Sequence, residues 1–236
     1  MGSYVWKDNS SVKGTSASEL LPGSGSNVTI LAGSGNDTLT VYGEKMKVFG
    51  EDGNDMVSIK SDGVYADGGS GNDTIYNRGF NNSIAGGEDS DSIKNGEHYY
   101  RGGSNVSIAG GTGNDSIYNY GSNVTIDAGE QNDTVNNGDQ YNSSLGLNVT
   151  ITGGAGDDSI KNYGSNVVID AGADKDDIYN DNNAHNVTIS AGEGDDEIYN
   201  YGAKVSINGA GGNDSIYNRG TNTYINAGEL LPQRHD

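Results

Sequence analysis

The strongest constraint on the fold is a six-residue phrase that recurs ten times at a nearly constant spacing. Each copy is rich in glycine and ends in aspartate, as in GGSGND ending at Asp73 and GGTGND ending at Asp115. Consecutive final aspartates lie 18, 18, 18, 24, 18, 25, 18, 20 and 18 residues apart. A fixed short period predicts a stacked repeat protein, in which each unit packs mainly against its neighbours.

The composition favours an elongated stack over a compact globule. Hydrophobic residues make up 32% of the 236 residues, and 39 residues are glycine. A stack needs only a thin apolar strip in each unit, because neighbouring units bury it. Low hydrophobicity with high net charge is also compatible with disorder, but the regular spacing argues against that reading.

Each unit reads as turn, strand, turn, strand. In the coil after Asp115, the segment 116–119 (SIYN) is followed by a second turn, 119–123, and a second short strand, 124–126. Alternation along a strand predicts which side chains face the core: Ile117, Val124 and Ile126 inside, and Ser116, Tyr118 and Thr125 outside. We therefore expect an all-β fold, a parallel β-solenoid of ten to eleven coils of about 18 residues with strands about 4.8 Å apart and almost no helix.

The two ends differ from the middle. We expect residues 1–24 to form an N-terminal cap or assembly segment, residues 25–226 the solenoid, and residues 227–236 a C-terminal cap or assembly segment. Leucines at both ends, Leu20, Leu21, Leu230 and Leu231, are candidates for covering the core. The alternative is that the ends are sticky and the rods stack head to tail, because an uncovered solenoid end is an unpaired sheet edge.

The two rows of turns carry different side chains. One row has the aspartate column, whereas the opposite row is flanked by asparagines such as Asn119 and Asn123. A stacked asparagine can bond its own backbone and the next coil, so that row closes without an ion. Stacked carboxylates about 4.8 Å apart repel by roughly 1 kcal/mol per pair in water, and a divalent cation between them reverses the sign. If aspartate occurred there only because it favours turns, we would expect it in both rows of turns.

Three copies of the extended phrase, GGSGNDTIY, GGTGNDSIY and GGAGDDSIK, resemble the nonapeptide GGxGxDxUx of the RTX (hemolysin-type) calcium-binding repeats. The resemblance spans about residues 25–226. It implies a parallel β-roll in which several Ca²⁺ ions lie in a row between successive coils, bound by the aspartate carboxylates and by turn carbonyls. The ligands implied are Asp37, Asp55, Asp73, Asp91, Asp115, Asp133, Asp158, Asp176, Asp196 and Asp214.

The chain also departs from this family. A usual β-roll has calcium turns along both edges, whereas here we expect them along one edge. Asp89, Gln131 and Lys175 break the consensus, so the sites around Asp91, Asp133 and Asp176 are expected to be weaker.

Charge limits the partners. The net charge of −20 makes nucleic acid an unexpected partner, because phosphate binding needs clustered Lys and Arg. No apolar run approaches membrane length, so we expect no membrane insertion, and with no cysteine there is neither a disulfide nor a thiolate site. The resemblance implies a secreted bacterial protein, extracellular or on the cell surface. The N-terminus does not read as a classical signal peptide.

We expect a structural or adhesive role rather than an enzyme: a calcium-rigidified rod or spacer, or alternatively a filament or surface-layer subunit. An insertion at 96–103, with His98, Tyr99, Tyr100 and Arg101, is a candidate contact for a glycan or cell-surface protein, although most such loops are only solvated. An outward tyrosine row indicates cross-strand packing or a sugar-stacking surface. Ice binding and the activity of a polysaccharide-active β-helix are weaker hypotheses. The third place of the phrase holds threonine only once, and no nucleophile–base pair or paired-carboxylate cleft can be argued from spacing.

Overall fold

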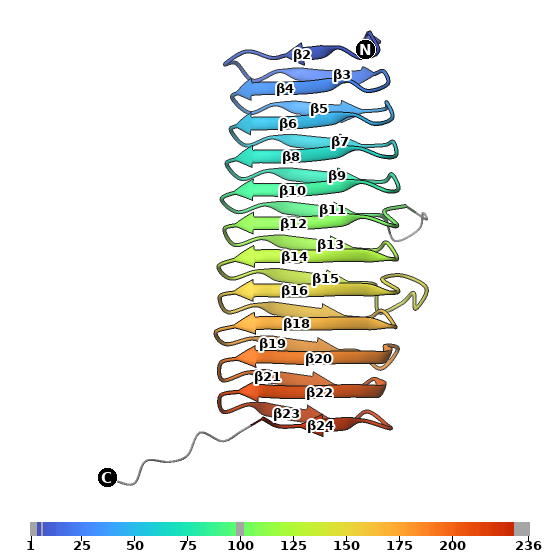
Figure 1. Ribbon diagram of the computed structural model, residues 1–236, viewed down its shortest axis with the longest axis vertical. Coiled ribbons are helices and arrows are strands. Elements are labelled where there is room, and N and C mark those ends of the chain that lie inside the picture. Colours follow the sequence, from blue (N-terminus) through green and yellow to red (C-terminus); the bar gives the residue numbers. More distant parts are fainter. Residues whose placement is uncertain (1–3, 6, 98–101, 229–236) are drawn as a thin grey trace, which may run out of the picture.

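The computed structural model describes residues 4–5, 7–97 and 102–228. In this part of the chain the backbone forms two parallel sheets of twelve strands each and no helix, so no helix of the described residues could span a membrane. Odd-numbered strands make one sheet and even-numbered strands the other. The chain alternates between the two layers and advances one rung per coil (Figure 1). The predicted parallel β-solenoid is confirmed.

Strands of the first sheet are short, mostly four residues, and those of the second are longer. The first sheet contains β1 (Tyr4–Val5), β3 (Leu20–Ser24), β5 (Thr38–Val41), β7 (Met56–Ile59), β9 (Thr74–Asn77), β11 (Ser92–Asn95), β13 (Ser116–Asn119), β15 (Thr134–Asn137), β17 (Ser159–Asn162), β19 (Asp177–Asn180), β21 (Glu197–Asn200) and β23 (Ser215–Asn218). The second contains β2 (Ser11–Lys13), β4 (Thr29–Ser34), β6 (Lys47–Asp52), β8 (Tyr65–Ser70), β10 (Ser83–Glu88), β12 (Ser107–Thr112), β14 (Val124–Glu130), β16 (Val149–Ala155), β18 (Val167–Ala173), β20 (His185–Glu193), β22 (Ala203–Gly211) and β24 (Tyr224–Asn226).

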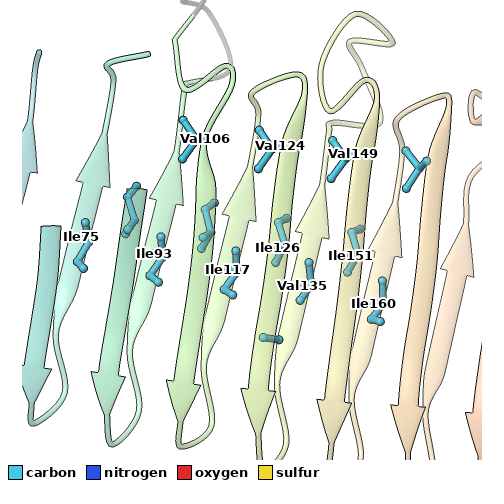
Figure 2. Packing of buried hydrophobic residues seen from close by; sticks show 14 of the residues in the cluster. Ile75, Ile93, Val106, Ile117, Val124, Ile126, Val135, Val149, Ile151 and Ile160 are labelled. Atoms are coloured by element: carbon cyan, nitrogen blue, oxygen red, sulfur yellow. The ribbon is translucent and has the colours of Figure 1, made fainter. Parts of the chain in front are cut away.

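The core is a narrow aliphatic strip between the two layers. Ile117 and Ile126 are fully buried and Val124 is 2% exposed, whereas Tyr118 is 40% exposed, as the alternation predicted. Figure 2 shows Ile93, Ile117 and other aliphatic side chains repeating along successive coils. Burying one such side chain contributes about 1.5–3 kcal/mol, so each coil depends on the neighbours that cover it.

The solenoid is longer than predicted at its N-terminal end. The described residues form twelve coils rather than ten to eleven, because β2 and β3, within the segment expected to be a cap, pair with β4 and β5. Leu21 packs against the core, but Leu20 is 50% exposed. Leu230 and Leu231 lie outside the described residues. The longer repeat intervals do not disturb the register, since Ser92 still pairs with Ser116 and Thr134 with Ser159.

Candidate metal centre

The turns that follow the even-numbered strands form one edge of the stack, at the left in Figure 1, and the ten phrases lie there. We number each turn 1 to 6, so that Gly110 is position 1 and Asp115 is position 6. Positions 2 and 4 have left-handed backbone, with φ of 123° at Gly111 and 130° at Gly113. Glycine adopts this conformation without steric cost, which explains why the phrase is rich in glycine.

The ten aspartates form one row bonded from coil to coil. Oδ1 of Asp115 accepts a hydrogen bond of 2.8 Å from the backbone N–H of Asp91, and the N–H of Asp115 donates to Oδ1 of Asp133 at 2.7 Å. Equivalent bonds of 2.6–3.2 Å join the other neighbouring coils, beginning with the N–H of Glu19. One oxygen of every carboxylate is therefore held in place by the coil before it.

The other carboxylate oxygen, Oδ2, is buried without a hydrogen-bond partner in all ten aspartates. Nine of these side chains are at most 3% exposed, and Asp214 is partly exposed. A buried polar atom without a partner costs about 1–3 kcal/mol, and more when it is charged. A row of ten such oxygens requires a counter-charge.

At position 1 this oxygen lies close against the glycine, in the place that a side chain would take. A Cβ atom on Gly110 would lie 2.4 Å from Oδ2 of Asp115 and 2.2 Å from the carbonyl oxygen of Ala128 in the next coil. The sheet register skips both position-1 residues, since the residues on either side of Gly110 pair with those on either side of Ala128. A carboxylate oxygen and a carbonyl oxygen thus approach one point from neighbouring coils.

Burial raises the pKa of all ten aspartates. Removal from water is the largest cause, the backbone hydrogen bond opposes it, and neighbouring carboxylates add to it in most turns. The pKa reaches about 8 for Asp91 and Asp176, about 7 for Asp73 and Asp133, and about 6 for Asp55 and Asp158. Without a cation, part of the row therefore holds protons near neutral pH.

Three turns carry a side chain at position 4, where the backbone is left-handed. These residues are Asp89, Gln131 and Asp174, with φ of 72°, 77° and 76°. They belong to the turns of Asp91, Asp133 and Asp176, for which weaker sites were predicted. Such a conformation costs roughly 1–2 kcal/mol for a residue other than glycine. Two similar residues at position 2, Glu51 and Ala210, were missed by sequence reasoning.

The structure corrects the role assigned to Lys175. Position 5 forms its own exposed row, in which a side-chain oxygen accepts the N–H of position 5 in the next coil: Oδ1 of Asn132 accepts from Asp157, and Oδ1 of Asp157 accepts from Lys175, both at 3.0 Å. Lysine has no acceptor atom, so the row is interrupted there and resumes in the next coil, where Oδ1 of Asp195 accepts from the N–H of Asn213 at 2.8 Å. The strained residue of this turn is Asp174.

The opposite edge contains a buried row of asparagines in which each amide bonds the next. Nδ2 of Asn119 donates to Oδ1 of Asn137 at 2.7 Å, and bonds of 2.7–2.9 Å join the rest of the row from Asn77 to Asn218. Asn119 also donates to the carbonyl of Gly121 and accepts from its N–H. The predicted bonds of this row, to its own backbone and to the next coil, are confirmed.

The asparagine row has a start that sequence reasoning missed. In the two coils before Asn77, the same register holds Val41 and Ile59. Asn82 satisfies the first acceptor, because its Nδ2 donates to Oδ1 of Asn77 at 2.7 Å. A polar residue in a column filled mostly by valine, such as Val106, was the available signal.

The insertions lie on this opposite edge, as predicted: the loops after β11 and β15 project from the same side in Figure 1. The shorter third insertion contacts the second, since Nδ2 of Asn183 donates to the carbonyl of Gln140 at 3.3 Å. The cluster His98, Tyr99, Tyr100 and Arg101 lies outside the described residues.

The outward tyrosines pack against one another across strands. Ring centroids of Tyr179 and Tyr201 are 5.5 Å apart, and those of Tyr199 and Tyr217 are 6.0 Å apart, with tilted planes. The hydroxyl of Tyr199 donates to Glu197 at 2.5 Å. These ring contacts support the packing interpretation of the row.

The residues fit an oxygen-liganded cation that draws on the backbone. Among the described residues, no three carboxylate, imidazole or thiol groups gather as a metal cluster, so any site takes one carboxylate per coil and fills its remaining positions with carbonyl oxygens or water. Such all-oxygen coordination, at about 2.3–2.6 Å, is typical of Ca²⁺ and not of zinc.

Comparison with known proteins points to the same ion. The family model of the RTX calcium-binding nonapeptide repeat matches residues 14–42, 67–97, 102–135, 109–143, 148–161 and 183–201. No curated protein sequence matches the chain. A solved structure of a hyperactive, Ca²⁺-dependent, β-helical antifreeze protein from an Antarctic bacterium is similar, with a TM-score of 0.60 and 23% identity over 100% of this chain and 80% of that one. At this identity the likeness concerns the fold. Because the family matches cover more than half of its length, the chain belongs to the RTX calcium-binding nonapeptide repeat family.

Proposed function

We propose that this chain is a calcium-rigidified extracellular rod that serves as a spacer or adhesive segment and has no catalytic role. The row of ten buried Oδ2 atoms without partners carries the proposal. The ten aspartates of the row would hold the ions together with turn carbonyls. Bound calcium would neutralise the row and link each coil to the next.

Calcium binding would be coupled to folding. Neighbouring coils supply the oxygens of each site, so the sites form only when the coils stack, and the binding free energy becomes folding free energy. Extracellular calcium would then fold the rod, whereas a calcium-poor cytosol would leave the chain unfolded and ready for export. This logic supports an extracellular or cell-surface location.

The test is to remove calcium at pH 8 with excess chelator and to follow strand content by circular dichroism. We expect the β signal to collapse and to return when calcium is added back. Magnesium is the matched control, because it demands a smaller octahedral shell and dehydrates reluctantly; it should not restore the signal. Strand content that survives in excess chelator would contradict the proposal.

Self-assembly into filaments or a surface layer is the second candidate. Within the described residues β24 is the last strand of its sheet, and it exposes Tyr224 and Ile225 at 69% and 41%. Light scattering and negative-stain microscopy after calcium addition separate the two candidates. Rods that never lengthen would reject assembly.

Other partners rank lower. The antifreeze protein shares the fold, but position 3 of the turns here carries Asp52, Glu88, Glu130 and Glu193 and a single threonine, Thr112. A thermal-hysteresis assay tests ice binding. Binding of a glycan or cell-surface protein by the 96–103 loop remains a proposal for glycan-array screening.

A further inference from the structure

The ten calcium turns differ in one small side chain at position 1. Six turns have glycine there, namely Gly50, Gly68, Gly86, Gly110, Gly153 and Gly209, and four have alanine, namely Ala32, Ala128, Ala171 and Ala191. All four alanines are fully buried. None of the ten residues has a positive φ, so the backbone conformation itself does not force glycine at this place.

The difference falls at the place where the two oxygens of the site lie against position 1. In the six glycine turns, an added Cβ would lie 2.2–2.4 Å from Oδ2 of the aspartate in the same turn. The same point lies 2.1–2.8 Å from the position-1 carbonyl oxygen of the next coil. An alanine methyl group cannot lie this close to either oxygen, so in an alanine turn the carboxylate oxygen, the carbonyl oxygen or both must lie farther from position 1. The methyl group therefore changes how these two candidate ligands are placed. The aspartates of the alanine turns still have a buried Oδ2 without a partner.

We infer that position 1 outweighs the side chain at position 4 in setting the calcium affinity of each turn, so that the six glycine turns, including that of Asp91, are tight and the four alanine turns are weak. The inference rests on the proposed function, because it takes calcium to be the ion of the row. The two kinds of turn are unevenly distributed. The turns of Asp55, Asp73, Asp91 and Asp115 form an uninterrupted run of glycine turns, whereas alanine occupies three of the four turns from Asp133 to Asp196. As calcium rises, the N-terminal half of the rod stiffens before the C-terminal half.

A calcium-binding isotherm on the full chain at pH 8 tests this inference. We expect two classes of site, six tight and four at least tenfold weaker, following the six glycines and four alanines. The combined variant Ala32→Gly, Ala128→Gly, Ala171→Gly and Ala191→Gly should move all ten sites into the tight class. Ala155→Gly is the matched control, because Ala155 is an exposed position-3 residue and its loss should leave the isotherm unchanged.

The reverse change gives an independent result. Gly153→Ala should transfer one site from the tight to the weak class, and it introduces a residue that four other turns already accommodate. If the combined variant does not fold, this variant decides alone. One class of ten equivalent sites, unaffected by either change, overturns the inference and leaves the calcium row intact. No calcium binding at all would overturn the proposed function as well.

Discussion

Both edges of the solenoid hold a row of polar side chains, aspartates on one edge and asparagines on the other, which differ only in a carboxylate oxygen or an amide nitrogen. Each buries one polar side chain per coil, and in each the donor of one coil points to Oδ1 of the next: the N–H of Asp91 to Asp115 on one edge, and Nδ2 of Asn95 to Asn119 on the other. The amide supplies donor and acceptor together, so the asparagine row is satisfied. The carboxylate supplies only acceptors, so each aspartate keeps one oxygen without a partner.

The comparison shows that the buried polar groups of one edge can be satisfied by the chain itself, while those of the other edge depend on protons or bound ions. The asparagine edge is complete in the folded chain at any calcium concentration. The aspartate edge reaches the same completeness only when protons or cations neutralise it. Stability should therefore respond to pH and calcium through the aspartate edge alone.

The largest effect is expected from pH in excess chelator. The pKa values of the folded row are raised from an ordinary value of 3.8 to about 6 to 8 in Asp55, Asp73, Asp91, Asp133, Asp158 and Asp176. A raised carboxyl pKa means that the folded state binds the proton more tightly than the unfolded state. Its stabilisation is therefore complete below about pH 4 and is lost as the pH rises through 6 to 8. Thermal melting in chelator should show a clear fall in Tm as the pH rises from 5, until at pH 8 the β signal is lost before heating.

Saturating calcium is the matched condition for this experiment. The ion takes the place of the protons, so Tm should change little over the same interval, and calcium binding near pH 7 should release protons. A metal-free Tm that is equal or higher at pH 8 than at pH 5 would show that the buried row does not control stability.

The second effect comes from placing a charge in the complete row. Asn119→Asp removes the Nδ2 donor to Asn137 and leaves an anion in a fully buried place. An uncompensated buried charge costs about 3–5 kcal/mol, so the free energy of unfolding at pH 8, measured by urea denaturation in calcium, should fall by about that amount. Asn123→Asp is the control: it lies in the exposed asparagine row, and such surface changes stay within about 0.5 kcal/mol. Equal losses in the two variants would contradict the comparison.

Much of this contrast could be predicted from the sequence, because it depends on period and residue type. Alternation placed Ile117 and Ile126 in the core, and the uneven distribution of aspartate separated the two edges. The extra N-terminal coil was missed because it lacks the final aspartate of the phrase, with Glu19 in that place, and because Leu20 stands where later coils have a polar strand-starting residue such as Thr38. The bond from a backbone N–H to Oδ1, and with it the unpartnered Oδ2, depends on side-chain orientation that spacing does not determine.

A third prediction concerns replacing one aspartate of the aspartate edge by asparagine, the residue of the opposite edge. In Asp115→Asn, Oδ1 can still accept from the N–H of Asp91, and the new amide nitrogen would face the carbonyl oxygen of Ala128. One hydrogen bond is gained and one buried charge is removed, so the chain in chelator should be stabilised by about 1–2 kcal/mol. In calcium the sign should reverse, because an ion at 100 times its Kd contributes about 2.7 kcal/mol. Urea denaturation in calcium at pH 8 and in chelator at pH 6, where part of the row still holds protons and the fold persists, gives the answer, with calorimetry for the lost ion. A loss of stability in chelator would contradict the assigned role of Oδ2.

The smallest effect concerns the place where the asparagine row begins. Asn82→Val replaces the amide by the residue that the same column holds in the coils on either side, Val64 and Val106, so packing should be preserved. The change removes the donor to Asn77, the donor to the Ser61 carbonyl and the acceptor of the Val64 N–H. Asn77 keeps the bond from the N–H of Gly79, and the valine buries more apolar surface, so the net loss in the free energy of unfolding should be about 1 kcal/mol. Hydrogen exchange should locate the loss at the amide of Val64, with the amides around Asn162 unchanged. Faster exchange along the whole row would show instead that the asparagines depend on a single starting residue, and that this edge too is conditional.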